Sequence, residues 1–375
     1  MKKIIRATTV PRTLDTLCRF LLRELSEEYE VVAVSSPGEE LFKINKREGV
    51  RVVAISMERR ISLIKDLKSL WKMWIFLRHE KPDLVHSMTP KAGLICMVSS
   101  WLAGVPVRIH TFTGLVWPTA TGIKRRVLMV MDWFTCLCAT NVIPEGEGVK
   151  NDLLNYKITK KPIKVLGHGN VKGVDLDYFK PDYYGTSNSN GPFTFIFVGR
   201  VVRDKGINEL VSAFDRLHRE QSNTRLLLVG DMEDVDPIST STLCRINQGD
   251  GILAVGRQDD VRYYYAQSNV LVLPSYREGF PNVVIEAGAM ELPCIVTDVN
   301  GSREIIINGE NGIIVPPKDE DALFGAMRFV VNHPKVVATM AANARPLIAT
   351  RFEQKYVRQC LYDYYHELLS INKMT

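Results

Sequence analysis

The sequence has 375 residues, enough for two domains of ordinary size. Hydrophobic residues make up 46% and charged residues 24% of the chain, a composition that excludes an intrinsically disordered protein. The formal net charge is +6, but residues 1–170 hold 27 Lys and Arg against 16 Asp and Glu, so the positive excess lies in the first half. This asymmetry fits an anionic partner, and it also fits an ordinary solvated surface.

Short β-rich runs alternate with helix-period segments along the first half of the chain. Amphipathic helices are expected between the runs, for example over Leu14–Leu25 and Ile61–Leu77. The expected strands are residues 2–8, 29–36, 50–56, 83–88, 105–114, 139–145 and 163–169.

The second half repeats this scheme after a Gly-, Ser- and Asn-rich stretch, Tyr183–Pro192, where we place the domain boundary. Helices are expected over Ile207–Gln221 and Val283–Met290. The expected strands are residues 193–200, 224–230, 252–256, 269–275, 293–298 and 312–317. Continuous apolar strands that alternate with helices predict parallel sheets covered on both faces, so the expected fold class is α/β.

Residues 59–74 form a basic amphipathic segment that contains Trp71 and Trp74. Such a helix can lie in an anionic membrane interface. The same pattern fits a helix that covers the sheet with its apolar stripe. When this segment is considered by itself, we favour the sheet-covering helix. A second basic cluster, Lys124–Arg126, supports a surface that meets lipid.

The cysteines and the apolar stretches indicate the compartment. Seven cysteines without a CxxC pair are typical of reduced thiols in a cytoplasmic protein. The first residues lack the apolar core of a signal peptide, and the most apolar stretch, Val127–Ile143, contains Asp132 and is short for a spanning helix. We expect a cytoplasmic protein, with a peripheral position at the inner face of the cytoplasmic membrane as an option.

A glycine turn with two cations follows the strand expected at residues 193–198. Gly199 and Arg200 come directly after that strand, and Lys205 follows in the same loop. Cations at the carboxyl end of a strand can stabilise the charge of a departing diphosphate. Basic loops of this kind are common in α/β proteins, so this loop alone does not identify a site.

A second loop, Ser275–Glu286, also follows an apolar strand and opens a helix. Asn282 is the expected N-cap of that helix, with Pro281 before it, and free amides at a helix start suit a phosphate group. Glu278 would lie at the mouth of the site, and Glu286 within the helix can accept hydrogen bonds from ribose hydroxyls. The alternative is a pair of surface glutamates around a helix start.

Two short acidic patterns match the D-x-D sequence that some transferases use to bind a metal. They are Asp175-Leu176-Asp177 and Asp234-Val235-Asp236, and both fall in expected loops. A pattern this short occurs by chance, and Arg200 and Lys205 already supply positive charge. We expect no metal ion and no other cofactor.

Together these elements resemble the family-4 retaining glycosyltransferases of the GT-B fold, in particular their capsule and exopolysaccharide transferases. The resemblance covers nearly all of residues 193–355 and extends into the first half. The matching stretches are Gly199–Lys205, Glu278–Glu286, Gly301–Ile305, Asn311–Pro316, Asp83–Ser87, Pro90–Leu94, Ala103–Pro106 and His110–Gly114.

This resemblance implies two facing Rossmann-like α/β/α domains with an interdomain cleft. Residues 1–182 would bind the acceptor, residues 183–352 would bind the nucleotide-sugar donor, and the last helix, residues 353–375, would pack back on the first domain. Arg200 and Lys205 would bind the donor diphosphate, Glu286 the ribose, and Glu278 would face the donor sugar. The implied catalytic and donor-binding residues are Arg200, Lys205, Glu278, Gly199, Arg257, Gly279, Phe280, Asn282, Val283 and Glu286.

The first domain departs from the family pattern at two places. Family members often carry a histidine after a Thr-Phe pair, near the donor sugar, whereas here Thr113 follows that pair. The loop after the first strand lacks the frequent Gly-Gly and reads Thr8–Thr13 instead. The candidates for contacts from this domain are Arg12, His86, His110 and Thr113.

The function implied is transfer of a hexosyl or N-acetylhexosaminyl group from a nucleoside diphosphate, expected to be UDP, to a lipid-linked or polysaccharide acceptor in surface polysaccharide synthesis. The partners expected are this donor, this acceptor and an anionic membrane surface, with no nucleic acid. A sugar-nucleotide epimerase of the same fold is an alternative. A nicotinamide-dependent oxidoreductase is disfavoured because the glycines of Gly167–Gly173 do not have the dinucleotide-binding spacing.

Overall fold

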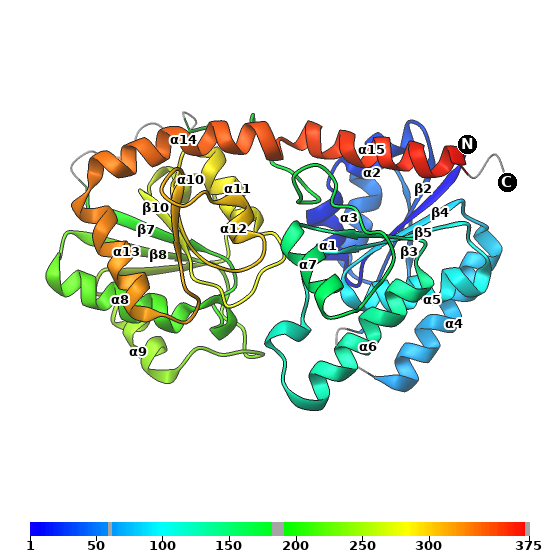
Figure 1. Cartoon of the computed structure of the whole chain (residues 1–375), viewed down its shortest axis with the longest axis horizontal. Helices are drawn as coiled ribbons and strands as arrows, with labels where there is room; N and C mark the ends of the chain where they lie inside the picture. The colour runs from blue at the N-terminus through cyan, green and yellow to red at the C-terminus, as the bar shows by residue number, and fades with distance from the viewer. Residues whose placement is uncertain (59–61, 182–190, 372–375) are drawn as a thin grey trace. The chain divides into compact units, whose positions relative to one another are not determined.

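The computed structural model describes residues 1–58, 62–181 and 191–371, and contacts divide the chain into two compact units (Figure 1). Unit 1 is Met1–Lys172 together with Val357–Thr375, and unit 2 is Gly173–Tyr356. Each unit contains a six-stranded sheet with flanking helices. Every pairing between neighbouring strands is parallel, which confirms the expected α/β class.

The sheet of unit 1 has the strand order β3-β2-β1-β4-β5-β6. Most of its strand residues are buried apolar side chains, because a sheet covered on both faces offers no solvent side. The strands are β1 Lys3–Ala7, β2 Glu30–Ser35, β3 Arg51–Ala54, β4 Leu84–Met88, β5 Val107–Phe112 and β6 Asn141–Pro144.

The helices of unit 1 form two layers, one on each face of the sheet. One layer contains α4 Leu63–Glu80, α5 Pro90–Ala103, α6 Gly122–Cys138 and α7 Glu147–Asn155. The other contains α1 Pro11–Cys18, α2 Leu21–Ser26, α3 Glu39–Glu48 and, from the end of the chain, α15 Gln354–Ile371. The adjacent residues Ile4 and Ile5 of β1 belong to different cores, because successive side chains of a strand point to opposite faces.

The sheet of unit 2 has the strand order β12-β11-β10-β7-β8-β9. Its strands are β7 Phe193–Val198, β8 Thr224–Val229, β9 Ile252–Gly256, β10 Val270–Leu273, β11 Cys294–Thr297 and β12 Gly312–Val315. Its helices are α8 Ile207–Glu220, α9 Thr240–Gln248, α10 Arg262–Ala266, α11 Asn282–Ala289, α12 Ser302–Ile305, α13 Glu320–Asn332 and α14 Pro334–Phe352, with a short 3-10 helix η3 at Arg203–Lys205.

One strand expected from the sequence does not form. Residues 163–169 contribute only a single bridge, between Ile163 and Val142 of β6. Gly167 then takes φ 56°, in the left-handed region, and turns the chain out of an extended course. The expectation of a strand here is therefore wrong, because glycine conformation ends the extended run before it can pair.

Unit 2 begins before the Ser- and Asn-rich stretch. The boundary expected within Tyr183–Pro192 falls largely on residues 182–190, which lie outside the described part of the chain. The contacts place the division earlier, because the Arg345 guanidinium of α14 donates to the carbonyls of Leu176 at 2.8 Å and Phe179 at 2.6 Å. These hydrogen bonds attach the segment that follows Lys172 to unit 2.

Candidate active site

Two loops meet at the carboxyl edge of the second sheet, between β7 and β10. From this neighbouring pair the strand order runs outward in both directions, through β8 and β9 on one side and through β11 and β12 on the other. Doubly wound sheets bind their ligands at such a switch point, outside the carboxyl ends of the strands. The loops after β7 and β10 therefore lie where a ligand is expected.

A glycine places Lys205 close to the end of β10. Gly206 has φ 69°, and a Cβ atom there would lie 2.1 Å from the carbonyl oxygen of Pro274. Only glycine permits this approach, so η3 ends and α8 begins directly against the carboxyl end of β10. Lys205, the last residue of η3, is thereby brought beside the loop that contains Glu278.

Lys205 and Glu278 form an ion pair between the two loops. Their side chains are 20% and 11% exposed, so the pair is largely buried but still reaches the surface. Two further contacts join the loops: Arg277 donates to the Asp204 carboxylate at 3.1 Å, and the Tyr276 amide donates to the Asp204 carbonyl at 2.9 Å. The structure thus brings together two of the three residues implied as catalytic.

The third, Arg200, is more open. Its side chain is 52% exposed, and its guanidinium donates to Glu233 at 2.9 Å. Gly199, which precedes it, is half-buried at the end of β7. Arg257 follows β9, two strands away from β7, and its nearest carboxylate is that of Asp259 at 3.8 Å. The side chains of Arg200 and Arg257 are therefore more exposed than that of Lys205, and they can reorient more easily towards a ligand.

The backbone of the second loop is packed tightly around Gly279 and Phe280. The Phe280 side chain is buried against Phe352, with 5.4 Å between ring centroids, so only its backbone can face a ligand. A Cβ atom on Gly301, where φ is 72°, would lie 2.3 Å from the Gly279 carbonyl oxygen. The glycine permits the loop after β11 to support the loop after β10.

Helix α11 begins at Asn282 itself. Pro281 occupies the cap position with φ −74° and ψ 105°, and its own side chain makes no capping hydrogen bond. The N-cap role expected for Asn282 is therefore wrong, because Asn282 takes the first helical position. The amides of the first helical turn, that of Val283 among them, point towards the carboxyl edge of the sheet and suit an anionic ligand.

Glu286 lies within α11, half-buried, and faces Tyr265 of α10. Burial, followed by the negative charge of Glu286, holds the pKa of the Tyr265 phenol well above its usual value. The phenol therefore stays protonated and is a hydrogen-bond donor. Its hydroxyl donates to the Val283 carbonyl at 3.4 Å and also interacts with the Glu286 carboxylate, so Tyr265 helps to orient Glu286, and no spacing in the sequence pointed to Tyr265.

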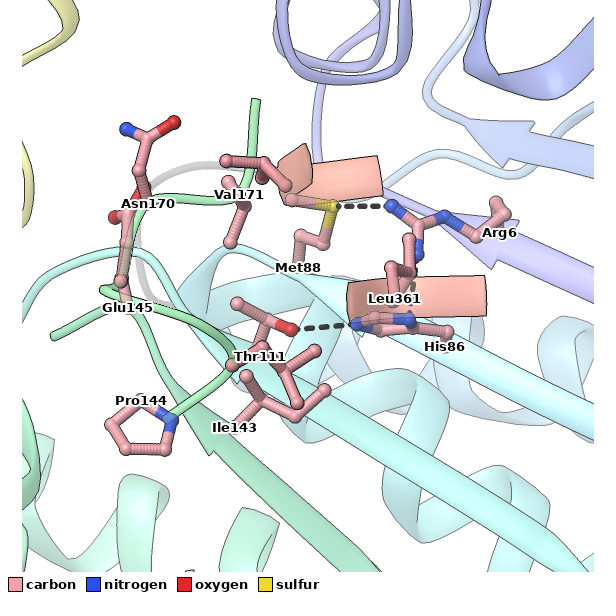
Figure 2. A pocket seen from close by; sticks show the side chains of 13 residues that line it. Arg6, His86, Met88, Thr111, Ile143, Pro144, Glu145, Asn170, Val171 and Leu361 are labelled. Atoms are coloured by element: carbon pink, nitrogen blue, oxygen red, sulfur yellow. Dashed lines mark hydrogen bonds between the residues drawn. The ribbon is translucent and has the colours of Figure 1, made fainter. Parts of the chain in front are cut away.

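The predicted residue His86 is enclosed in unit 1 (Figure 2). Its Nδ1 lies 2.6 Å from the Arg6 guanidinium and 2.6 Å from the Tyr365 hydroxyl, and its Nε2 lies 2.6 Å from Thr111 Oγ1. A guanidinium only donates, so Nδ1 accepts and Nε2 carries the proton. Burial first and the charge of Arg6 second hold the pKa of His86 well below its usual value. A neutral His86 thus joins β4 to β1, β5 and α15.

A cavity of about 20 Å³ lies beside this network, room for about one water molecule (Figure 2). Glu145 and Asn170 line its opposite side. No sequence pattern pointed to Arg6, which lies within an apolar strand run, or to its partner Tyr365 in the last helix. Both are buried and lie next to the predicted His86.

The three other first-domain candidates have different surroundings. His110 is buried, with Nδ1 2.9 Å from Ser87 Oγ, and burial lowers its pKa to about 3. Arg12 is exposed at the start of α1, and Thr113 is half-buried just after β5. Arg12 and Thr113 are therefore the candidates in unit 1 with side chains that reach solvent.

Within residues 1–58, 62–181 and 191–371, no group of three or more His, Cys, Asp and Glu side chains is placed to hold a metal ion. The acidic patterns take part in loop structure instead. Asp236 pairs with Arg203 at 3.1 Å and accepts from the Asp204 amide at 2.7 Å. Asp175 accepts from the Asp177 amide at 3.0 Å.

Comparison with known proteins identifies the family. The model of the glycosyl transferase 4-like domain matches residues 16–169, and that of glycosyl transferases group 1 matches residues 185–346. The chain is 34% identical over 376 residues to the capsular polysaccharide biosynthesis glycosyltransferase CapM of Staphylococcus aureus, with 98% of each chain covered.

Two further relatives agree with this assignment. The UDP-Gal:alpha-D-GlcNAc-diphosphoundecaprenol alpha-1,3-galactosyltransferase of Escherichia coli is 30% identical over 310 residues, which cover 78% of each chain. The structure of Anabaena HepE in complex with UDP-glucose has the same fold, with a TM-score of 0.80 at 17% identity over 98% of this chain and 100% of HepE. The chain belongs to the family-4 glycosyltransferases, which have the GT-B fold.

Proposed function

We propose that this glycosyltransferase retains anomeric configuration and moves a sugar from UDP to a hydroxyl group of a lipid-linked saccharide in surface polysaccharide synthesis. The Lys205–Glu278 pair at the junction of β7 and β10 carries the proposal. It places a cation and a carboxylate next to each other where a doubly wound sheet binds its ligand.

The donor diphosphate would bind Lys205 and Arg200. Both cations follow β7, and charge-assisted hydrogen bonds to phosphate oxygens are among the strong ones. Lys205 would exchange its bond with Glu278 for one with phosphate, which leaves the carboxylate able to accept from a sugar hydroxyl. Glu286, oriented by Tyr265, would accept from the ribose hydroxyls. UDP-glucose in the complex of HepE supports a UDP-linked donor.

The transfer would proceed on one face of the sugar. The bond between the anomeric carbon and the diphosphate oxygen breaks, and the diphosphate leaves with the electron pair. The acceptor oxygen forms its bond on the same face and gives its proton to the departing diphosphate. Lys205, Arg200 and the amides at the start of α11 would stabilise the charge that develops there.

The acceptor proposal rests on the relatives. One is named for capsular polysaccharide biosynthesis, and the other for transfer to a saccharide on diphosphoundecaprenol. Arg12 and Thr113 reach solvent in unit 1 and are the side chains we assign to acceptor contacts. We further propose that no metal ion is needed, so that transfer continues in EDTA, and activity lost in EDTA and restored by magnesium or manganese would contradict this.

A panel of nucleotide sugars tests the proposal. Thermal stability should rise with UDP-glucose, UDP-galactose or UDP-N-acetylglucosamine and much less with a GDP-sugar, because a ligand of the native state stabilises it. Incubation with a polyprenyl-diphosphate-linked saccharide should then give a product whose anomeric configuration, read by NMR, equals that of the donor. An inverted product would contradict retention, and an altered donor sugar without acceptor would favour an epimerase.

A further inference from the structure

Two helices of unit 1 carry apolar stripes on their solvent side. Apart from the adjacent pair at the start of α4, steps of three or four residues place each set along one face of its helix. The exposed set is Leu63, Ile64, Leu67, Trp71 and Ile75 on α4 and Ile123, Val127, Val130, Phe134 and Leu137 on α6. Exposure reaches 82% at Ile64 and 81% at Ile123. We call these residues the apolar face.

The apolar face is separate from the core of unit 1. The opposite sides of the same helices already pack inward, through Met73 and Leu77 of α4 and Cys136 of α6. Helix α5 packs against both α4 and α6 and is itself largely buried. Soluble monomers rarely gather many large exposed apolar side chains on neighbouring helices, and such surfaces mark interaction sites, so we infer that the apolar face has a partner.

Beside the ion pair of Lys65 with Glu58, the exposed charges that flank the apolar face on α4 and α6 are positive. Lys68 and Lys72 on α4 and Lys124 and Arg126 on α6 are exposed and lie next to the stripes in sequence. Arg59 and Arg60, which precede α4, lie outside the described residues.

The acidic side chains of the two helices are turned away from solvent. Asp66, 17% exposed, bonds to Lys91, and Asp132 is buried against Trp117. Glu80, at the end of α4, is engaged by Lys3 and Arg51. The surface around the apolar face therefore presents cations without acids from α4 or α6.

We propose that the apolar face and its flanking cations bind α4 and α6 into the interface of an anionic lipid bilayer. Helices with an apolar side and basic flanks insert partway between headgroups and acyl chains. No helix in the described part of the chain is long and apolar enough to cross a membrane, so the contact is interfacial. A second copy of the chain fits less well, because it would bring like charges together.

This inference deepens the proposed function and rests on it, because a lipid-linked acceptor is met at a bilayer surface. It also changes the interpretation of residues 59–74, for which the sequence favoured a helix that only covers the sheet. Helix α4, which contains most of that segment, covers the sheet through Met73 and Leu77 and presents a second apolar stripe outward. The two interpretations of the segment describe two sides of one helix.

Co-sedimentation with lipid vesicles tests the proposal. The protein should sediment with vesicles of phosphatidylglycerol and phosphatidylcholine and bind pure phosphatidylcholine at least about tenfold more weakly. Salt should weaken binding as the Debye length falls, with a residual part from apolar insertion. Emission of the exposed Trp71 should shift to shorter wavelength on binding, and Trp71→Phe should reduce that shift.

Two variants separate charge from insertion. Lys68→Gln, Lys72→Gln, Lys124→Gln and Arg126→Gln together should lower the partition coefficient about 600-fold at low salt, because each cation near the surface contributes about fivefold. Ile64→Ser, Leu67→Ser, Ile123→Ser and Val127→Ser together should remove the salt-resistant part. The matched controls in unit 2, Lys335→Gln with Arg328→Gln and Val235→Ser with Leu253→Ser, should bind as the original protein does.

Three outcomes would overturn the proposal. They are no binding to anionic vesicles, equal binding to both lipid compositions, or a dimer in analytical ultracentrifugation that the apolar variant dissociates. Stabilisation by UDP-glucose, measured without vesicles, should be the same in all these variants. If stabilisation is absent while vesicle binding persists, the donor proposal fails and the membrane proposal stands.

Discussion

The two sheets have the same strand order but place their charged groups differently at the switch point. In unit 1, Arg6 of β1 and His86 of β4 lie inside the strands, buried and bonded to each other. In unit 2, the corresponding strands β7 and β10 contain no charged side chain, and the charged residues Lys205 and Glu278 lie in the loops that follow them.

We interpret the buried charges of unit 1 as structural and expect those beyond the strands of unit 2 to contact the ligand. A cation inside a strand that is covered on both faces can only bond to neighbouring strands and helices, so Arg6 serves to join α15 to the sheet. A cation in the loop after a strand keeps contact with solvent and with any ligand at the sheet edge. We therefore expect variants at the unit 2 switch point to affect activity and variants in the unit 1 network to affect stability.

The largest effect is expected at Lys205. Lys205→Ala should lower kcat about a hundredfold to a thousandfold, as the loss of a preorganised charge at a developing anion does. Arg200→Ala should cost about tenfold, because its exposed guanidinium is less confined. Steady-state kinetics measures both, with Lys335→Ala as a control on α14. Near-normal turnover in both variants would contradict the assignment of the donor site to the loops of unit 2.

A pH-dependent stability effect is expected at Asp132, which burial gives a pKa of about 7. The folded state keeps the proton from about pH 4 to 7 while the unfolded chain has released it, so stability falls as pH rises through this window. Asp132→Asn removes the fall and can still accept from Trp117. It should stabilise the protein by about 2 kcal/mol at pH 8 and little at pH 4.

Thermal unfolding across this pH range measures the difference between the two proteins. A difference in melting temperature that does not change with pH would show that Asp132 is ionised in the folded protein throughout.

A smaller effect is expected at Tyr365. Tyr365→Phe deletes the hydroxyl that bonds to Arg6 and His86 and should destabilise the protein by about 1–2 kcal/mol. Stabilisation by UDP-glucose should persist, because Tyr365 belongs to unit 1 and the donor loops to unit 2. If Tyr365→Phe lost that stabilisation at an unchanged melting temperature, the assignment of structural charge to unit 1 and of donor binding to unit 2 would be contradicted.

The sequence predicted the strands of unit 2 and the two loops after β7 and β10 well, because apolar runs and glycine turns are local signals. It was less successful at residues 163–169, where glycine conformation prevented a strand. The N-cap expected at Asn282 was also wrong, because cap position depends on where the helix hydrogen bonds begin, one residue earlier than the pattern indicated.

Local patterns in the sequence determined the α/β class, the alternation of elements and the candidate residues Lys205 and Glu278. Tertiary structure alone decided that Lys205 and Glu278 pair, that His86 is sealed by Arg6 and Tyr365, and that the stripes of α4 and α6 face solvent. The reason is range: periodicity and turn chemistry act over a few residues, whereas burial and pairing depend on elements such as β1 and α15, which lie at opposite ends of the chain.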